Sequence, residues 1–348
     1  MVAMMVVKPS FMIFVGMVLG GIIMAVTSSG VLGVWVGLEL NFFGFVPLLL
    51  GKSMLEGECC LKYFVIQVLG SGIFFLGVLM VISKMMVSLV LSFWGGIFLV
   101  CSGLFLKLGL FPFHFWFPSV VSFSSWLNLF LLSTFQKLAP FWVISGLSMG
   151  VEFVGFMGML ICVTSLVGAI GGLGQIYFRP LFAYSSLVHS GWMGLLCLSS
   201  SMSFFLYMSL YSMILGGFVF SLWLSQLSYV GGLSSKSSTE NSIVFWVSTF
   251  FLSLAGLPPL LGSVLKLYGV LVLNNSFLLI LSVLILSSVV SLFYYLNMFF
   301  SLSVSGVEKL DWGMGRSSEV SFFSPRNFFV LLNMVSGILC LLFLGLFT

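Results

Sequence analysis

Apolar runs of about 20 residues, separated by short polar stretches, follow one another along almost the whole chain. A helical run of this length matches the hydrocarbon thickness of a bilayer. The strands of a membrane barrel would need alternating polarity, which these runs lack. Because backbone groups in hydrocarbon must satisfy their own hydrogen bonds, we expect the runs to be helices. The sequence therefore predicts an all-α, polytopic membrane protein.

Eleven membrane spans are predicted when the chain is divided at charged residues and at clusters of glycine, serine and proline. Composition agrees with this number, because 61% of the 348 residues are hydrophobic and only 6% are charged. No small-residue cleavage pattern follows the first run, which favours a membrane helix over a signal peptide. The predicted spans lie near residues 9–27, 30–51, 62–83, 87–108, 124–146, 152–174, 181–199, 203–228, 241–272, 276–301 and 326–347.

The scarcity of charged side chains excludes several classes of protein. A soluble enzyme of this length would need far more polar surface. The net charge is +4, from 12 Lys and Arg against 8 Asp and Glu, and these residues form no basic stripe that would bind nucleic acid. The six cysteines show no paired ligand spacing, so we predict neither a disulfide framework nor a metal site.

The basic residues that lie outside the spans or at their first residue predict the orientation of the chain. Eight of them fall on the side of the N-terminus, and only Lys84 lies on the opposite side. By the positive-inside rule the N-terminus is inside and, with eleven spans, the C-terminus is outside. The two longest loops, 229–240 and 302–325, are expected on the inner side as solvated surface. The eight residues are Lys8, Lys52, Lys62, Arg179, Lys236, Lys309, Arg316 and Arg326.

Apart from residues at the very first position of a span, four charged residues lie within predicted spans, where each costs roughly 2.5 to 3.5 kcal/mol even on a lenient insertion scale. Glu39 is in the middle of its run, too far from either end to reach the interface. Lys137 is central in its run and Lys266 follows a pair of prolines. Lys107 is nearer a span end, where a lysine can extend towards water. Charges placed in this way are typical of ion or proton pathways.

Prolines lie close to each of these lysines. A proline removes a backbone donor and frees a carbonyl one turn earlier, so Pro112, Pro140 and the pair Pro258 and Pro259 predict broken or bulged helices. Irregular backbone at membrane depth is tolerated only where protein or a water-filled cavity receives the freed groups. The charges and the breaks together predict a hydrated path through the interior.

These residues have a structural interpretation and a functional one. Glu39 and one lysine could form a static buried ion pair that fixes helix packing. Three lysines against one glutamate make that pair insufficient, and buried lysines that respond to a movable charge suit a proton relay. His114 and His189, the only two histidines, are interpreted equally well as relay positions or as an aromatic-belt residue and a hydrogen-bonded core residue, respectively.

Six segments between residues 30 and about 270 carry recognisable motifs. They are WVGLELNFFGFVPLL, KYFVIQVLGSGIFFLG, LFLKLGLFPFHFWFPSVV, STFQKLAPFW, LFAYSSLVHSGWM and LSLAGLPPLLGSVLKLY. The run Lys-x-Gly-x-x-Pro-x-His and the run Gly-Leu-Pro-Pro are specific when they occur together. In this order the segments resemble the subunit 2 family of respiratory complex I (NADH-ubiquinone oxidoreductase chain 2), which is one of the antiporter-like membrane subunits.

The resemblance implies a proton-translocating subunit of an H⁺-translocating NADH:ubiquinone reductase. NADH oxidation and ubiquinone reduction would take place elsewhere in the complex, so NADH, FMN, iron–sulfur clusters and ubiquinone belong to other subunits and no cofactor is expected in this chain. Other membrane-arm subunits, including neighbouring antiporter-like subunits, and lipids are the implied partners. The location would be the mitochondrial inner membrane, with the N-terminus on the matrix side and the C-terminus on the intermembrane-space side. A free-standing monovalent cation/proton antiporter and a purely structural subunit remain alternatives.

The resemblance also implies an internal organisation and roles for the charged residues. Two inverted five-helix repeats, about 1–150 and 151–301, would each hold a broken helix, and 302–348 would form a loop and a final helix. The implied relay consists of the mid-membrane carboxylate Glu39, its partner Lys107, the central Lys137, Lys266 of the second broken helix, and His114 and His189 as intermediate positions.

Overall fold

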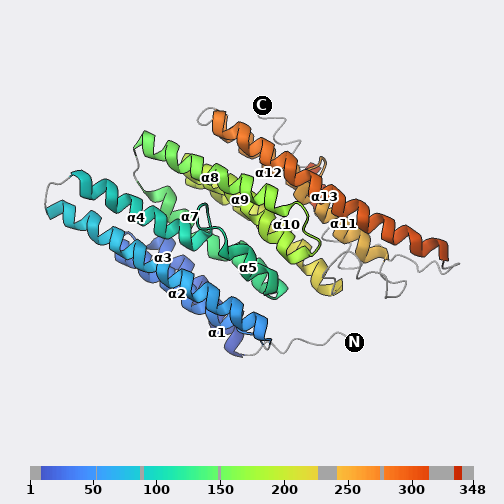
Figure 1. The fold of residues 1–348 in the computed structure, drawn as a ribbon, viewed down its shortest axis with the longest axis horizontal. Coiled ribbons are helices and arrows are strands. Elements are labelled where there is room, and N and C mark those ends of the chain that lie inside the picture. The colour runs from blue at the N-terminus through green and yellow to red at the C-terminus, as the bar shows by residue number, and fades with distance from the viewer. Residues whose placement is uncertain are drawn as a thin grey trace. The chain divides into compact units, whose positions relative to one another are not determined.

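The computed structural model describes residues 9–51, 53–86, 90–147, 150–225, 241–274, 278–312 and 333–338 (Figure 1). These residues form α-helices joined by short connections, and no β-strand occurs among them. The prediction of an all-α membrane fold is confirmed, since eight of the described helices are long and apolar enough to cross a bilayer. The chain divides into two compact units, Met1–Phe156 and Met157–Thr348.

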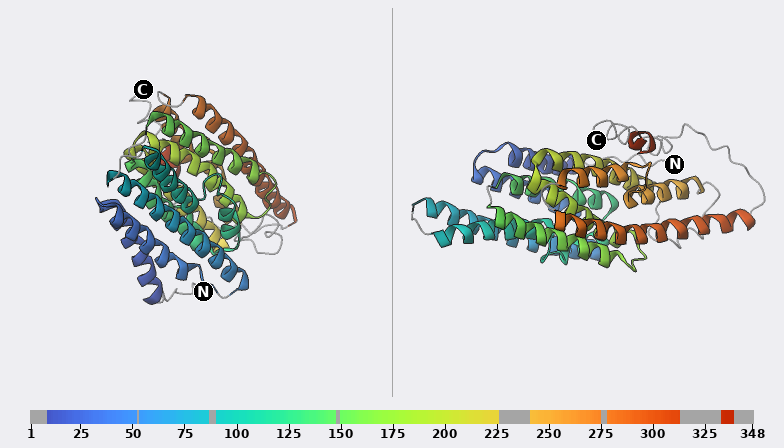
Figure 2. Two further views of the ribbon diagram at one scale, coloured as in Figure 1. Left: turned by 60° about the vertical axis from the view of Figure 1, so that its left-hand side comes forward. Right: turned by 90° about the horizontal axis from the view of Figure 1, so that it is seen from above.

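The described part of the first unit consists of two helical hairpins followed by three shorter helices. α1 packs against α2, and α3 lies beside α4 along its length in each view (Figures 1 and 2). Glycines permit the close approach of α1 and α2, because a Cβ on Gly37 would lie 2.6 Å from the backbone nitrogen of Ala25. The helices are α1 Pro9–Thr27, α2 Val31–Leu49, α3 Met54–Met86, α4 Val90–Leu108, α5 Trp116–Phe123, α6 Trp126–Ser133 and α7 Phe135–Gly146.

The second unit is built around α9, which is buried along most of its length and contacts α10, α12 and α13. Its serines donate to carbonyls three residues earlier, as Ser190 does to Leu187 at 2.7 Å, so their hydroxyls can be buried without a partner on another helix. The helices are α8 Val151–Gly172, which begins within the first unit, α9 Phe178–Ser199, α10 Ser201–Ser225, α11 Asn241–Ala255, α12 Leu261–Leu273 and α13 Leu278–Trp312, with a helical segment at 333–338.

Two helices extend beyond the spans predicted for them. α3 begins at Met54, eight residues before the predicted span, because Ser53 and Glu56 form a capping box. The backbone nitrogen of Glu56 lies 3.3 Å from Ser53 Oγ, and that of Ser53 lies 3.2 Å from Glu56 Oε2. α13 continues to Trp312, so the predicted loop 302–325 is wrong in its first part. Helical hydrogen bonds do not require apolar side chains, and loss of hydropathy alone does not end a helix.

Helix breaks occur at two of the three predicted places. Residues 109–115 separate α4 from α5 at Pro112, and residues 256–260 separate α11 from α12 at Pro258 and Pro259. The break expected at Pro140 is wrong, since Pro140 lies inside α7. The interruption comes earlier, at Thr134, whose hydroxyl and backbone nitrogen both donate to the carbonyl of Phe130.

Several predictions concern residues that the structure does not describe. The loop 229–240, the second part of the loop 302–325 and most of the final span 326–347 lie outside the described residues. Among the basic residues that predict the orientation, only Lys62 and Arg179 have described side chains. The orientation therefore stays a prediction.

Candidate functional site

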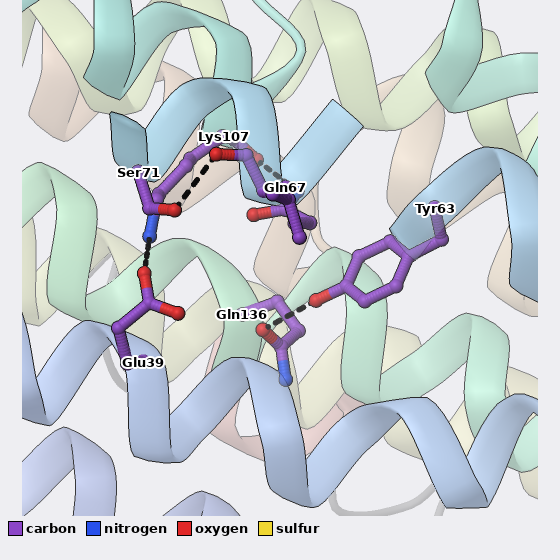
Figure 3. Close-up of polar contacts among 7 residues, drawn as sticks. Glu39, Tyr63, Gln67, Ser71, Lys107 and Gln136 are labelled. Carbon is purple, nitrogen blue, oxygen red and sulfur yellow. Dashed lines mark hydrogen bonds and ion pairs between the residues drawn. The ribbon is translucent and has the colours of Figure 1, made fainter. Parts of the chain in front are cut away.

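Glu39 and Lys107 form an ion pair inside the first unit (Figure 3). Glu39 lies in the middle of α2 and Lys107 in the last turn of α4, and Lys107 Nζ is 3.3 Å from Glu39 Oε1. The lysine side chain is 3% exposed and the glutamate side chain 15%. At this burial each charge depends on the other, because an isolated ion in a low-dielectric interior is strongly disfavoured. The structure thus brings together two of the predicted site residues.

Lys107 lies at the broken end of α4 and points towards Glu39. Gly70 of α3 leaves room for the lysine, since a Cβ there would lie 3.0 Å from Lys107 Cγ. The carbonyls near the break receive neutral donors: Gln67 Nε2 lies 3.2 Å from the oxygen of Lys107 (Figure 3), and Trp116 Nε1 lies 3.1 Å from that of Leu106. The backbone is satisfied without the ammonium group, which remains available for Glu39.

A second polar cluster links three helices of the same unit. The hydroxyl of Tyr63 on α3 donates to Oε1 of Gln136 on α7 at 3.1 Å (Figure 3), and Gln136 Nε2 donates to Oδ1 of Asn41 on α2 at 2.9 Å. Asn41 follows Glu39 by two residues, and Gln136 directly precedes Lys137. These hydrogen bonds therefore connect the helix that carries the ion pair to the helix that carries Lys137.

Lys137 is buried at the start of α7, at 2% exposure, and its ammonium nitrogen lies 4.7 Å from the centroid of the Phe117 ring. An aromatic face attracts a cation without neutralising it. His114 lies in the break between α4 and α5 and is also buried. Its carbonyl accepts from the backbone nitrogen of Phe117 at 3.1 Å, and its Nδ1 has no hydrogen-bond partner among the described residues. Phe117 is thus a common neighbour of both predicted relay residues.

Lys266 forms a hydrogen bond across the break between α11 and α12 in the second unit. Its Nζ donates to the carbonyl of Ala255 at 2.6 Å, one of the carbonyls that the proline pair was predicted to free. The backbone turns at Gly256, which has a φ of +81°, a conformation that favours glycine. A Cβ at Gly256 would lie 2.8 Å from Cδ and Cε of Lys266, so the glycine also leaves space for the lysine stem.

His189 lies on α9, a helix that contacts α12. Its Nδ1 is 2.9 Å from the hydroxyl of Tyr207, and its ring centroid is 4.7 Å from that of Tyr211. One turn after His189, the ring of Trp192 packs on α12, where a Cβ at Gly269 would lie 2.7 Å from Trp192 Cε3. The helix faces that carry His189 and Lys266 are therefore close to the contact between α9 and α12.

The uncharged members of the site were not predicted from the sequence. Asn41, Gln67 and Gln136 interrupt apolar runs in the same way as the charged residues do, and that pattern was the available signal. Tyr63 carried no such signal, because tyrosine is common in membrane helices near the interface. Within the described ranges, no group of three or more His, Cys, Asp or Glu side chains is arranged to hold a metal ion.

The fold and the site define a class, namely polytopic helical membrane proteins whose broken helices carry a buried lysine, Lys107, and a half-buried one, Lys266. Residues 28–294 match the family model described as NADH:quinone oxidoreductase/Mrp antiporter, TM, and the chain belongs to this family. Among its curated relatives are NADH-ubiquinone oxidoreductase chain 2 of Anopheles gambiae, 33% identical over 311 residues (88% of this chain and 89% of the relative), and that of Mytilus edulis, 33% identical over 295 residues (84% and 86%). The resemblance to the subunit 2 family is confirmed.

Solved structures show the same fold at lower identity. A chain of respiratory complex I from Thermus thermophilus has a TM-score of 0.76 at 22% identity, over 95% of this chain and 78% of that chain. A chain of the Mrp complex from Dietzia sp. has a TM-score of 0.76 at 15% identity, over 95% and 75%. The helical architecture is therefore common to these membrane complexes.

Proposed function

We propose that this chain is the antiporter-like subunit 2 of mitochondrial complex I and translocates protons across the inner membrane. The energy would come from NADH oxidation and ubiquinone reduction, which other subunits with NADH, FMN, iron–sulfur clusters and ubiquinone carry out. Membership of the family and the names of its relatives support this assignment. The observation in this chain that carries it is the buried ion pair between Glu39 and Lys107, next to a break in the helix.

The ion pair of Glu39 and Lys107 could make the protonation of Lys137 depend on the position of the Glu39 carboxylate. While Glu39 is 3.3 Å from Lys107, the two charges largely cancel at longer range. If Glu39 turns towards another positive charge, the ammonium of Lys107 is left unbalanced in a medium of low dielectric. Its repulsion then favours release of the proton from Lys137, the next buried lysine of the unit. The cluster of Tyr63, Gln136 and Asn41 holds the intervening helices in place.

Lys266 is the proposed recipient in the second unit, with His114 and His189 as intermediate positions. A lysine that donates to a neutral carbonyl, as Lys266 does, can lose its proton without leaving a buried carboxylate unpaired. His189 has a hydroxyl within hydrogen-bond distance, which suits a group that gains and loses a proton.

The proposal also covers the repeats of the chain, its orientation in the membrane and its neighbours. We infer two inverted repeats, about 1–150 and 151–301, followed by 302–348, with the N-terminus in the matrix and the C-terminus in the intermembrane space. Other membrane-arm subunits and lipids would surround the chain. Exposed apolar side chains on α1, such as those of Met12, Ile13 and Ile23, fit such surroundings because they would otherwise face water.

Replacing Lys137 by Met tests the relay. In assembled complex I reconstituted in vesicles, we expect fewer protons pumped per NADH oxidised, because the central titratable group is lost. Lys62→Met is the matched control, since Lys62 is exposed on α3 and should leave the ratio unchanged. An unchanged ratio in the Lys137 variant would reject the relay. Ion exchange by the purified chain alone would instead favour a free-standing antiporter.

A further inference from the structure

The break between α11 and α12 is held by a residue from near the end of the chain. Asn333, in the helical segment 333–338, is 2% exposed. Its Oδ1 accepts from the hydroxyl of Ser253 at 3.2 Å and from the backbone nitrogen of Leu261 at 3.3 Å. Ser253 belongs to the last turn of α11, and Leu261 is the first residue of α12. One amide oxygen therefore joins the two halves of the broken helix.

The beginning of α12 needs this acceptor. The first backbone N–H groups of a helix have no partner within the helix, and a polar side chain usually supplies one. Here the N-cap residue is Leu260, which makes no side-chain cap hydrogen bond. Asn333 supplies the missing oxygen from another part of the chain. Its segment packs directly on the break, because a Cβ at Gly337 would overlap the carbonyl oxygen of Pro259.

Lys266 spans the same break with a hydrogen bond of its own. Its Nζ donates to the carbonyl of Ala255 at the end of α11, while its backbone is in the second turn of α12. The length of that hydrogen bond depends on where α12 begins relative to α11. The two bonds accepted by Asn333 Oδ1 determine this relation, since they tie Leu261 to Ser253.

We propose that Asn333 is a positioning residue for Lys266, which sets the distance of the ammonium group from the broken end of α11. The inference rests on the proposed function of Lys266 in proton transfer. Only the oxygen of the Asn333 amide takes part, because its Nδ2 has no hydrogen-bond partner among the described residues. A glutamine, whose neutral amide oxygen can accept the same hydrogen bonds, should therefore replace Asn333, whereas an apolar side chain of similar size should not.

The test compares variants of Asn333 in assembled complex I reconstituted in vesicles, with protons pumped per NADH oxidised as the readout. Asn333→Leu should lower the ratio to that of Lys266→Met, while the rate of NADH oxidation by ubiquinone in uncoupled vesicles is unchanged. Asn333→Gln should retain the normal ratio, since it keeps a neutral amide oxygen as the acceptor and adds no charge at the break. Asn297→Leu, at an exposed asparagine of α13, is the matched control and should have no effect.

The double variant Asn333→Leu with Lys266→Met separates positioning from general destabilisation. If Asn333 acts through Lys266, the double variant pumps as many protons per NADH as Lys266→Met alone. A normal ratio in Asn333→Leu, an equal loss in Asn333→Gln, or a further loss in the double variant would overturn the inference. If the leucine variant does not assemble, Asn333→Ala replaces it in each comparison. A normal ratio in Lys266→Met would instead refute the proposed function of that lysine.

Discussion

The ion pair of Glu39 and Lys107 allows a static packing contact to be distinguished from a working element of the pump. We consider three variants: Glu39→Gln, Lys107→Met and the two together. Each single change leaves one buried charge without its partner, whereas the double change removes both. The double variant therefore restores electrical neutrality at the site but does not restore a charge that can respond to its surroundings.

The burial of the two side chains gives the size of the expected effects. Glu39→Gln leaves the ammonium of Lys107, which is 3% exposed, without its carboxylate. Breaking a buried pair in this way lowers the free energy of unfolding by about 3 to 5 kcal/mol. Lys107→Met leaves Glu39, which is 15% exposed and can keep some hydration, so its loss should be near the lower limit. The double variant should be close to neutral, because replacing both ions by uncharged groups often costs little.

Two measurements on the assembled complex decide between the interpretations. Thermal inactivation reports stability, and the number of protons pumped per NADH oxidised reports coupling. We expect both single variants to inactivate at lower temperature and to pump less. The double variant should regain thermal stability but not the proton ratio. A double variant with normal stability and a normal ratio would refute the reasoning, since the pair would then serve packing alone.

Two further substitutions test the surroundings of the lysines. Gly256→Ala should lower the proton ratio, because the Cβ of the alanine would displace the stem of Lys266. Gly174→Ala is the control, since Gly174 also has a positive φ and an alanine there has the same backbone cost of about 1 to 2 kcal/mol. Its Cβ would meet no atom within 4 Å, so the ratio should stay normal. Equal ratios in the two glycine variants would contradict this. Tyr63→Phe removes the donor to Gln136 and should lower stability by about 0.5 to 1.5 kcal/mol together with a partial loss of pumping; normal thermal inactivation would show that this hydrogen bond contributes nothing.

The predicted parts of the fold are those that depend on hydropathy and on proline chemistry. Long apolar runs leave helices as the only structure that satisfies the backbone, so most spans were predicted to within a few residues. The breaks at Pro112 and Pro258 follow from the missing N–H group. Pro140 does not end its helix: it lies within α7, which begins at Phe135, so the interruption falls just over one turn before the proline.

The parts that were not predicted depend on contacts between residues far apart in the chain. The charged residues were identified because their cost in a membrane is large whatever their neighbours. Which lysine pairs with Glu39 came from the family resemblance, since spacing along the sequence does not specify contacts between helices. The link from Tyr63 to Asn41 and the contact of Asn333 with the second break need the tertiary structure, because each joins helices that are distant in sequence.

The two breaks differ in how their backbone carbonyls are satisfied, and from this difference we infer different tasks for their lysines. In the first unit the neutral side chains of Gln67 and Trp116 take the carbonyls, so the ammonium of Lys107 is held by a carboxylate. In the second unit Lys266 itself binds a carbonyl. When the partner of a lysine carries a full charge, the protonation of that lysine depends on where the charge lies. A backbone carbonyl carries only a dipole and is fixed in the helix, so it gives no such dependence. Lys107 is accordingly suited to sensing a change in charge, and Lys266 to releasing a proton.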